Sequence, residues 1–364
     1  MAADFSTLQQ MITLARGQLT RGDWDYLIGA AETETSLKRN RLAFDRLALK
    51  ARVLLHDVAQ VHTQRRLLDV DLRIPVLLAP IGSLQVFEAG GGLSAARAAE
   101  TFGVMQILSS VCSPDFETLA RECAGPKIHQ VYAHGDEAWL MDIVGRTQAS
   151  GYKAICLTVD TQVYSRRERD ILKRYVPLTG RRAENAPPPE AVVTLQPSFT
   201  WELVKRIKDR FDIPLVLKGI ACGEDAELAV RHGVDVVYVS NHGGRQLDQG
   251  RGTLDMLPEV VRAVGGRAKV VIDGGILRGT DVLKALALGA DAVGIGRLEG
   301  FAMAAGGADA VVRMLKILES EIRINLALMG LSSIDQLNPD CVLPAEPVVP
   351  VHALSAFPLL DEDY

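Results

Sequence analysis

The chain has 364 residues, of which 48% are hydrophobic and 23% are charged, and its formal net charge is −5. This composition excludes extensive disorder, and the interspersed charges offer neither a basic stripe for nucleic acid nor a polybasic patch for an anionic membrane. No stretch is long and apolar enough for a membrane span, and the N-terminus shows no signal-peptide pattern. The five cysteines lack CxxC pairing, which indicates reduced thiols. We therefore expect a cytoplasmic protein whose partners are small molecules.

The order of predicted elements indicates a (β/α)8 barrel. Residues 5–46 are expected to form helices laid over one end of the fold. From residue 75 onward, short apolar or β-branched runs alternate with segments of helical periodicity, the pattern of parallel βα units. The expected strands are residues 75–79, 104–108, 127–132, 153–159, 214–218, 234–239, 269–272 and 292–295. The expected helices include residues 92–102, 137–148, 201–210, 224–232 and 280–288. Eight strands are the number that closes such a barrel.

Two segments depart from this alternation. Residues 174–200, with three consecutive prolines, interrupt the fourth unit, and a loop of this length is typical of an active-site lid or of disorder. We expect one barrel domain over residues 1–338, including the N-terminal helices, and a C-terminal extension over residues 339–364. The extension is rich in proline and acidic at its end, so we expect it to wrap the surface or a neighbouring subunit. It carries no recognisable chemistry.

The densest chemical signal follows the sixth predicted strand. Active sites of such barrels lie at the carboxyl ends of the strands, and there the chain reads Ser240-Asn241-His242-Gly243-Gly244-Arg245. A lone histidine is more often structural than catalytic. Here, however, a side chain that titrates near neutrality stands three residues before an arginine, which can grip a carboxylate with two parallel hydrogen bonds. The run predicts a base beside a carboxylate clamp.

A second signal follows the seventh and eighth strands. Asp273-Gly274-Gly275 and Gly294-Ile295-Gly296-Arg297 stand where such barrels often bind phosphate through exposed backbone N–H groups and a nearby cation. Glycine pairs alone are weak signals, but two of them at the expected places, one with an arginine, favour a phosphate site.

These motifs resemble a known family, the FMN-dependent 2-hydroxy acid oxidases and dehydrogenases, which include glycolate oxidase, lactate oxidase and mandelate dehydrogenase. The resemblance covers residues 24–337. It implies FMN at the barrel mouth, oxidation of a 2-hydroxy acid to a 2-keto acid, transfer of electrons to oxygen, a quinone or another acceptor, and a homo-oligomer, commonly a tetramer. The matching segments are Ser240 to Asp248, Thr158 to Thr161, Arg166 to Glu168, Leu217 to Gly219 and Asp273 to Gly275.

The resemblance also implies a role for each matching residue. His242 would be the general base at the substrate hydroxyl or Cα–H, and Asp160 would orient its ring. Tyr132 would contact the hydroxyl or carboxylate of the substrate, and Lys218 would place positive charge near N1 of the flavin. The substrate carboxylate would be held by Arg167, Arg245 and Tyr26. The flavin and its phosphate would contact Pro80, Ile81, Gly82, Ser109, Gln130, Thr158, Ser240, Asp273, Gly274, Gly275, Arg278, Gly296 and Arg297.

Departures from the family pattern predict a modified site. Leu277 stands where the family usually has an arginine, so one phosphate cation is expected to be missing unless Arg278 or Arg297 compensates. Val111 replaces an aromatic residue of several members, and Tyr164 replaces a smaller aliphatic one. Both are expected to line a substrate pocket reshaped for a bulkier or aromatic side chain. Gly82, which is alanine in many of the oxidases and glycine in mandelate dehydrogenase, slightly favours an acceptor other than oxygen.

Two alternatives remain open at this stage. A lysine at a strand end, such as Lys218, is also how Schiff-base lyases hold carbonyl substrates. A barrel that binds flavin but has lost turnover is the other alternative. The joint presence of His242, Asp160, Arg167 and Arg245 argues against the second, because a silent protein needs neither a base nor a clamp.

Overall fold

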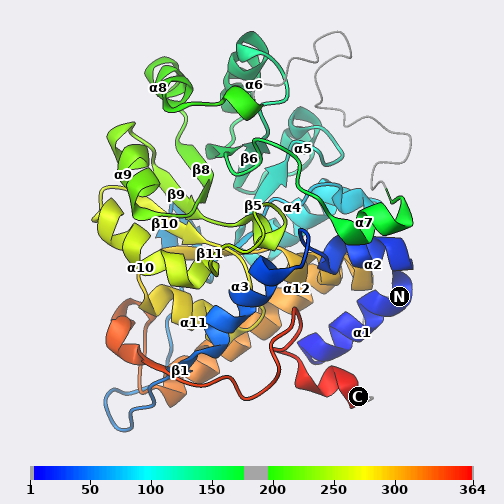
Figure 1. Ribbon diagram of the computed structural model, residues 1–364. Coiled ribbons are helices and arrows are strands. Elements are labelled where there is room, and N and C mark those ends of the chain that lie inside the picture. The colour runs from blue at the N-terminus through cyan, green and yellow to red at the C-terminus, as the bar shows by residue number, and fades with distance from the viewer. Residues whose placement is uncertain (1–3, 176–195, 363–364) are drawn as a thin grey trace.

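The computed structural model describes residues 4–175 and 196–362. Its core is a closed parallel barrel in which β11 pairs with β4 to complete the ring (Figure 1). The remaining strands follow one another in chain order around the ring, so the predicted (β/α)8 architecture is confirmed. The strands are β4 (Val76–Leu78), β5 (Met105–Ser109), β6 (Lys127–Val131), β7 (Ala154–Thr158), β8 (Leu215–Ile220), β9 (Val236–Val239), β10 (Lys269–Ile272) and β11 (Ala292–Ile295).

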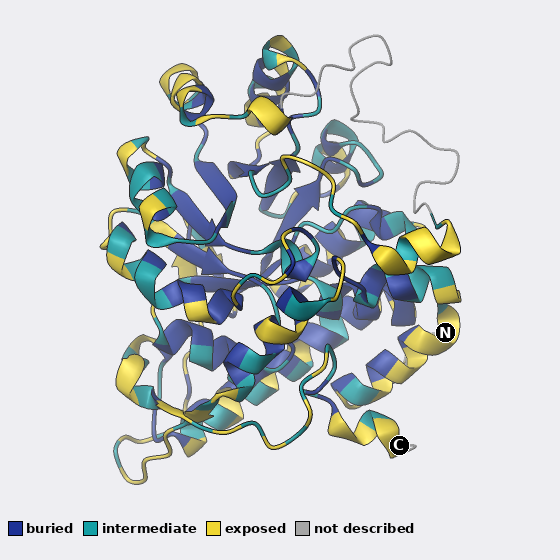
Figure 2. Cartoon of the chain, viewed as in Figure 1, coloured by how far each residue is buried: buried dark blue, intermediate teal, exposed yellow. Residues whose placement is uncertain are grey.

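Both faces of the barrel wall are buried, as expected for a parallel sheet covered by helices. Alternate strand residues such as Met105 and Ile107 join an inner cluster, and their neighbours pack under the helices. Figure 2 shows the buried residues concentrated on the strands and on the inward faces of the helices. The strands therefore form a rigid support for whatever follows their carboxyl ends.

The helical layer consists of α4 (Gly91–Phe102), α5 (Phe116–Glu122), α6 (Glu137–Ala149), α8 (Trp201–Arg210), α9 (Gly223–Arg231), α10 (Thr253–Val264), α11 (Gly279–Ala287) and α12 (Arg297–Leu328). Side-chain capping fixes the residue at which some of these helices begin. Asp115 and Asp136 are N-caps whose side chains accept a hydrogen bond from the third residue of α5 and α6, which satisfies an otherwise unpaired N–H group. Gly307, with a φ of 62°, kinks α12.

Three helices occupy the predicted N-terminal region: α1 (Leu8–Gln18), α2 (Arg21–Ile28) and α3 (Thr35–Asp45). The Asp248 carboxylate ties α3 to the loop after β9, because its Oδ1 accepts from Ser36 N at 2.9 Å and its Oδ2 accepts from Thr33 N at 2.9 Å. The N-terminal helices thereby reach the carboxyl ends of the strands.

Sequence patterns did not predict the short strands outside the barrel. The hairpin of β2 (Arg65–Leu67) and β3 (Val70–Leu72) packs Leu67 and Leu72 against the inner cluster. Strand β12 (Val342–Pro344), inside the predicted extension, pairs antiparallel with β1 (Leu47–Leu49).

The long loop after β7 is only partly described. It contains α7 (Glu168–Lys173) and resumes at the short helix Gln196–Ser198. The central part of the predicted lid, residues 176–195, lies outside the described residues. Within the two described ranges, no helix has the length and hydropathy needed to cross a bilayer.

Candidate active site

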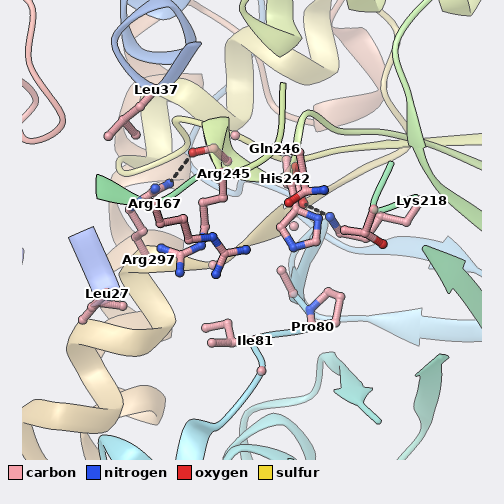
Figure 3. A pocket seen from close by; sticks show the side chains of 18 of the residues that line it. Leu27, Leu37, Pro80, Ile81, Arg167, Lys218, His242, Arg245, Gln246 and Arg297 are labelled. Carbon is pink, nitrogen blue, oxygen red and sulfur yellow. Dashed lines mark hydrogen bonds and ion pairs between the residues drawn. The ribbon is translucent and has the colours of Figure 1, made fainter. Parts of the chain in front are cut away.

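A cavity of about 820 Å³ opens at the carboxyl ends of the barrel strands. Figure 3 shows the guanidinium groups of Arg167, Arg245 and Arg297 grouped on one side of this cavity, with His242 and Lys218 on the other. The sequence-predicted residues that line it are Tyr26, Pro80, Ile81, Gly82, Val111, Tyr132, Tyr164, Arg167, Lys218, His242, Arg245, Asp273, Gly274, Gly275, Gly296 and Arg297.

The other predicted residues are not part of the cavity lining. Ser109, Gln130, Thr158 and Ser240 are buried, and Gln130 Nε2 donates to Thr158 Oγ1 at 2.9 Å. Asp160 supports His242. Arg278 is not brought together with the rest, because its guanidinium pairs with Glu321 at 2.6 Å.

His242 and Asp160 form a hydrogen-bonded pair, with Nδ1 of the imidazole 3.0 Å from Asp160 Oδ1. The carboxylate accepts, so Nδ1 carries the proton and Nε2 keeps its lone pair for the cavity. The backbone at His242 has a φ of 58°, and the Asn241 side chain supports this turn by accepting from Gly244 N at 3.0 Å. The local chain therefore fixes both the ring and its tautomer.

The surroundings keep this pair in the form that a base requires. Burial lowers the pKa of His242, and although Asp160 acts in the opposite direction, Lys218 and Arg167 lower it further, so the pKa lies below its ordinary value. Burial alone would raise the pKa of Asp160, but the attraction of His242 and Lys218 outweighs it and lowers the pKa. At neutral pH the imidazole is neutral beside a carboxylate.

Lys218 is held as an ammonium. Its Nζ donates to Ser240 Oγ at 2.8 Å and lies 3.1 Å from Asp273 Oδ2. Burial acts to lower the pKa of Lys218, but the charges of Asp273 and Asp160 outweigh it, and the pKa is raised. A Schiff-base lysine must lose its proton to become nucleophilic, so this environment disfavours the lyase alternative.

Arg245 and Arg167 place two guanidinium groups at the cavity, and neither forms a salt bridge with a carboxylate among the described residues. Arg245 Nη1 donates to the carbonyl oxygens of Tyr26 at 2.6 Å and Gly29 at 3.0 Å, and Arg167 lies 4.4 Å from the centre of the Tyr164 ring. Burial, followed by repulsion from Arg167, lowers the pKa of Arg245. This region is therefore suited to an anion.

Two tyrosines flank these cations. Tyr26 donates its hydroxyl to Gly82 O at 3.1 Å, and the Tyr132 ring lies 6.4 Å from the His242 ring. Burial raises the pKa of both phenols. They are hydrogen-bond donors at neutral pH.

The part of the cavity around Gly275, Gly296 and Arg297 has features of a phosphate site. Gly296 precedes α12 without a side-chain cap, and a Cβ added to it would meet nothing within 4 Å, so the uncapped helix end faces open space suited to an anion. Gly275 has a φ of 88°, and a Cβ there would lie 2.8 Å from Asn40 O. Arg297 adds a cation, although burial and repulsion from Arg245 lower its pKa to about 9. These residues fit the phosphate of FMN, and Lys218 fits its ring.

Sequence reasoning missed several lining residues, including His134, Gln196, Arg41 and Ala353. Gln196 follows the long loop, and its Nε2 donates to Thr158 O at 2.9 Å while its Oε1 accepts from Ala133 N at 2.7 Å. Arg41 and Ala353 belong to α3 and to the C-terminal extension. His134 stands just after the third predicted strand, where the strand-end rule could have found it, whereas Gln196, Arg41 and Ala353 follow no predicted strand.

Comparisons with known proteins agree with the resemblance seen in the sequence. The model of the FMN-dependent dehydrogenase family matches residues 15–344. The chain is 37% identical over 345 residues to an L-lactate oxidase of Nostoc sp., covering 89% of this chain and 94% of the relative. It is 38% identical over 337 residues to a peroxisomal (S)-2-hydroxy-acid oxidase of Oryza sativa subsp. japonica, covering 89% and 92%.

Solved structures of 2-hydroxy acid oxidising enzymes are also similar to this chain. A soluble mutant of the membrane-associated (S)-mandelate dehydrogenase of Pseudomonas putida superposes with a TM-score of 0.89 at 32% identity, over 94% of this chain and 100% of that one. A mandelate oxidase crystallised with (S)-2-phenylpropionate gives a TM-score of 0.86 at 36% identity, over 95% and 100%.

Proposed function

Because this chain belongs to the family of FMN-dependent dehydrogenases and is an FMN-dependent oxidoreductase acting on CH–OH groups, we propose that it oxidises a 2-hydroxy acid with a bulky or aromatic side chain. The product is the corresponding 2-keto acid. His242 is the base, with Asp160 behind it, and Arg167 and Arg245 form the carboxylate clamp.

One observation carries this proposal: a neutral imidazole and two guanidinium groups, which have no carboxylate partner among the described residues, face a single cavity (Figure 3). An imidazole that is hydrogen-bonded to a buried carboxylate can accept a proton from an alcohol. The guanidinium groups can hold a carboxylate by parallel hydrogen bonds. A 2-hydroxy acid carries the alcohol and the carboxylate on adjacent carbons, so it meets both requirements at once.

The reaction removes two electrons and two protons from the substrate, one proton from the hydroxyl group and one from Cα. Bound FMN would supply the chemistry that takes up the two electrons and one of the protons. His242 Nε2 accepts the other proton, and Asp160 stabilises the imidazolium that forms through the 3.0 Å hydrogen bond. The Tyr132 hydroxyl remains protonated in its buried position and donates to the substrate oxygen. The imidazolium later returns its proton to the medium or to the reduced acceptor.

Lys218 and Asp273 support the cofactor end of the reaction. The ammonium of Lys218 is fixed by Ser240 and Asp273, so it offers a preorganised positive charge where negative charge develops on a reduced flavin ring. The uncapped start of α12 and Arg297 hold the phosphate.

The proposed substrate size rests on the cavity wall. Phe87, Val111, Tyr164 and Pro197 line it beside Tyr26, so the region next to the clamp is largely apolar. Apolar walls favour an extended hydrocarbon or aromatic side chain over the hydrogen or methyl group of the smallest 2-hydroxy acids. From the resemblance we also propose a homotetramer and an electron acceptor that is oxygen, a quinone or another compound. The cysteine pattern supports a cytoplasmic location.

The test is anaerobic bleaching of the bound flavin by 2-hydroxy acids of increasing bulk, followed by absorbance in a stopped-flow instrument. We expect mandelate to reduce the flavin faster than glycolate. We also expect His242→Ala to lower the limiting rate by roughly 10²-fold or more, the usual effect of losing a positioned base. Asp142→Asn, an exposed carboxylate on α6, is the matched surface control. A flavin that no 2-hydroxy acid bleaches would rule the proposal out.

A further inference from the structure

We propose that the C-terminal segment, residues 345–361, is part of the cofactor site and retains FMN by closing the phosphate end of the cavity at Ala353. This inference rests on the same FMN site as the proposed function. The segment is the part of the chain in which sequence patterns indicated no chemistry.

The segment is anchored to the N-terminal region along its length. Ala345 N donates to Arg46 O at 2.8 Å, Ser355 Oγ donates to Asp45 Oδ2 at 3.1 Å, and Leu359 N donates to Gln9 Oε1 at 2.7 Å. Figure 1 shows the segment running from the neighbourhood of β1 past α3 and ending beside α1. Between these anchors, Ala353 lines the cavity with Leu37 and Leu277.

The phosphate end has few available cations. Arg41 lines it but is neutralised by Asp281 at 2.8 Å and Asp45 at 2.9 Å, and Arg278 is neutralised by Glu321. Arg297 donates to backbone carbonyls, including Gly29 O at 2.8 Å, and the described residues supply no carboxylate ion pair to it. A phosphate dianion therefore relies on this one guanidinium and on backbone N–H groups.

Leu277 adds an apolar side chain to the cavity wall. It lines the cavity and its residue surface is only 4% exposed, and Leu37, Ile276 and Ala353 line the same cavity. Attraction between a guanidinium and a phosphate grows as water is excluded, because the effective dielectric constant falls. A cover of apolar side chains thus offsets part of what a second guanidinium would contribute, and the C-terminal segment supplies one side of that cover.

A hydrogen-bond chain also links the segment to the glycine loop. Ser355 Oγ binds Asp45, Asp45 pairs with Arg41, and Arg41 Nη1 donates to Gly275 O at 2.7 Å. The same segment buries Phe357, whose ring lies 5.7 Å from the Arg278 guanidinium. Removal of the segment would expose Asp45 and Arg41 to water and loosen their hold on Gly275.

The test uses single charges at position 353, because the truncation of a docked segment can unfold the protein. FMN release from the holoenzyme is followed by the rise in flavin fluorescence after dilution, for Ala353→Asp, Ala353→Lys and the neutral control Ala353→Asn. If Ala353 faces the phosphate, we expect release to be roughly tenfold faster for Ala353→Asp and several-fold slower for Ala353→Lys than for Ala353→Asn, from the attraction and repulsion of unit charges. Added salt should shrink both differences.

Equal release rates from the three variants would overturn the inference, and so would differences that do not respond to salt. Ser355→Ala, which removes only the hydrogen bond to Asp45, should speed release by a few-fold through the hydrogen-bond chain. The readout is independent of turnover. An enzyme whose flavin is not reduced by any 2-hydroxy acid refutes the proposed function without touching this result, and equal release rates leave the proposed function intact.

Discussion

Replacement of Asp160 by asparagine tests the proposed base most directly. The amide oxygen of asparagine can still accept from His242 Nδ1, so the ring keeps its orientation and its tautomer while the carboxylate charge is lost. Nδ1 and Oδ1 are 3.0 Å apart, and opposite unit charges about 4 Å apart attract by about 4 kcal/mol at an effective dielectric constant of about 20. The whole of this attraction is available only when the imidazole is fully protonated.

A proton that is half transferred in the transition state would realise about half of that energy, and each 1.4 kcal/mol is about tenfold in rate. We therefore expect flavin reduction in Asp160→Asn to slow by about 30-fold to about 1,000-fold. Anaerobic stopped-flow reduction at saturating substrate measures this rate. A rate within threefold of the unmodified enzyme would refute the assignment of Asp160 as the group that stabilises the imidazolium.

The pH profile gives a second readout. Burial lowers the pKa of His242, and Asp160 is the main group that raises it again. Activity needs the neutral imidazole, so it is lost as the pH falls through the pKa of His242, and Asp160→Asn should move this acidic limb to lower pH. Asp170→Asn is the control, since Asp170 lies near Arg245 and Arg167 and is not among the main influences on His242. A limb that moves to higher pH would contradict the reasoning.

Three further predictions follow from single contacts. Arg245→Lys should raise KM at least tenfold with a smaller change in kcat, because a planar fork becomes a point charge; steady-state kinetics measures it, and an unchanged KM would reject the clamp. Lys218→Met should lower the free energy of unfolding by about 3 to 5 kcal/mol, because it leaves the buried Asp273 without its cationic partner. The control Lys208→Met, which removes a part-exposed ion pair with Asp235, should lower the free energy of unfolding by less than about 1 kcal/mol. Urea unfolding of both variants measures the difference. Glu299 is fully buried without a hydrogen-bond partner among the described residues, and burial raises its pKa well above 4.5. The unfolded chain releases this proton above about pH 4.5 while the fold retains it, so the unfolding free energy should fall as the pH rises from there, and Glu299→Val should remove that slope; equal slopes would show that Glu299 is ionised in the fold.

The sequence predicted the barrel because its strands are short apolar runs bounded by glycine and polar residues, and parallel strands buried on both faces have this composition. It also predicted many of the residues that line the cavity, since residues that directly follow strands must share the carboxyl end of the barrel. His242, Asp273 and Arg297 are of this kind. The positions that mark the ends of the strands are thus also the positions of the candidate catalytic and binding residues.

The rest depends on contacts between segments that are far apart in sequence. Arg41 reaches the glycine loop from α3, and Ala353 lines the cavity from the C-terminal segment. No periodicity marks either residue, because each is positioned by its tertiary neighbours. Arg278 illustrates the opposite case. Its position in the sequence suggested a cation for the phosphate, but its guanidinium pairs with Glu321 of α12. The sequence around Arg278 does not predict this partner.

The end of α2 explains how two cations, Arg245 and Arg297, can stay available at one cavity. Carbonyl oxygens of the last turn of α2 and of Gly29 accept from Arg245 and Arg297, and Gly29 O is shared by both at 3.0 Å and 2.8 Å. A helix carboxyl end carries partial negative charge, so these carbonyls orient the guanidinium groups without cancelling their charge, as a carboxylate would. The repulsion that remains between Arg245 and Arg297 lowers the pKa of the latter and is relieved only when anions arrive. A site built in this way favours two anionic groups together, the cofactor phosphate and the substrate carboxylate.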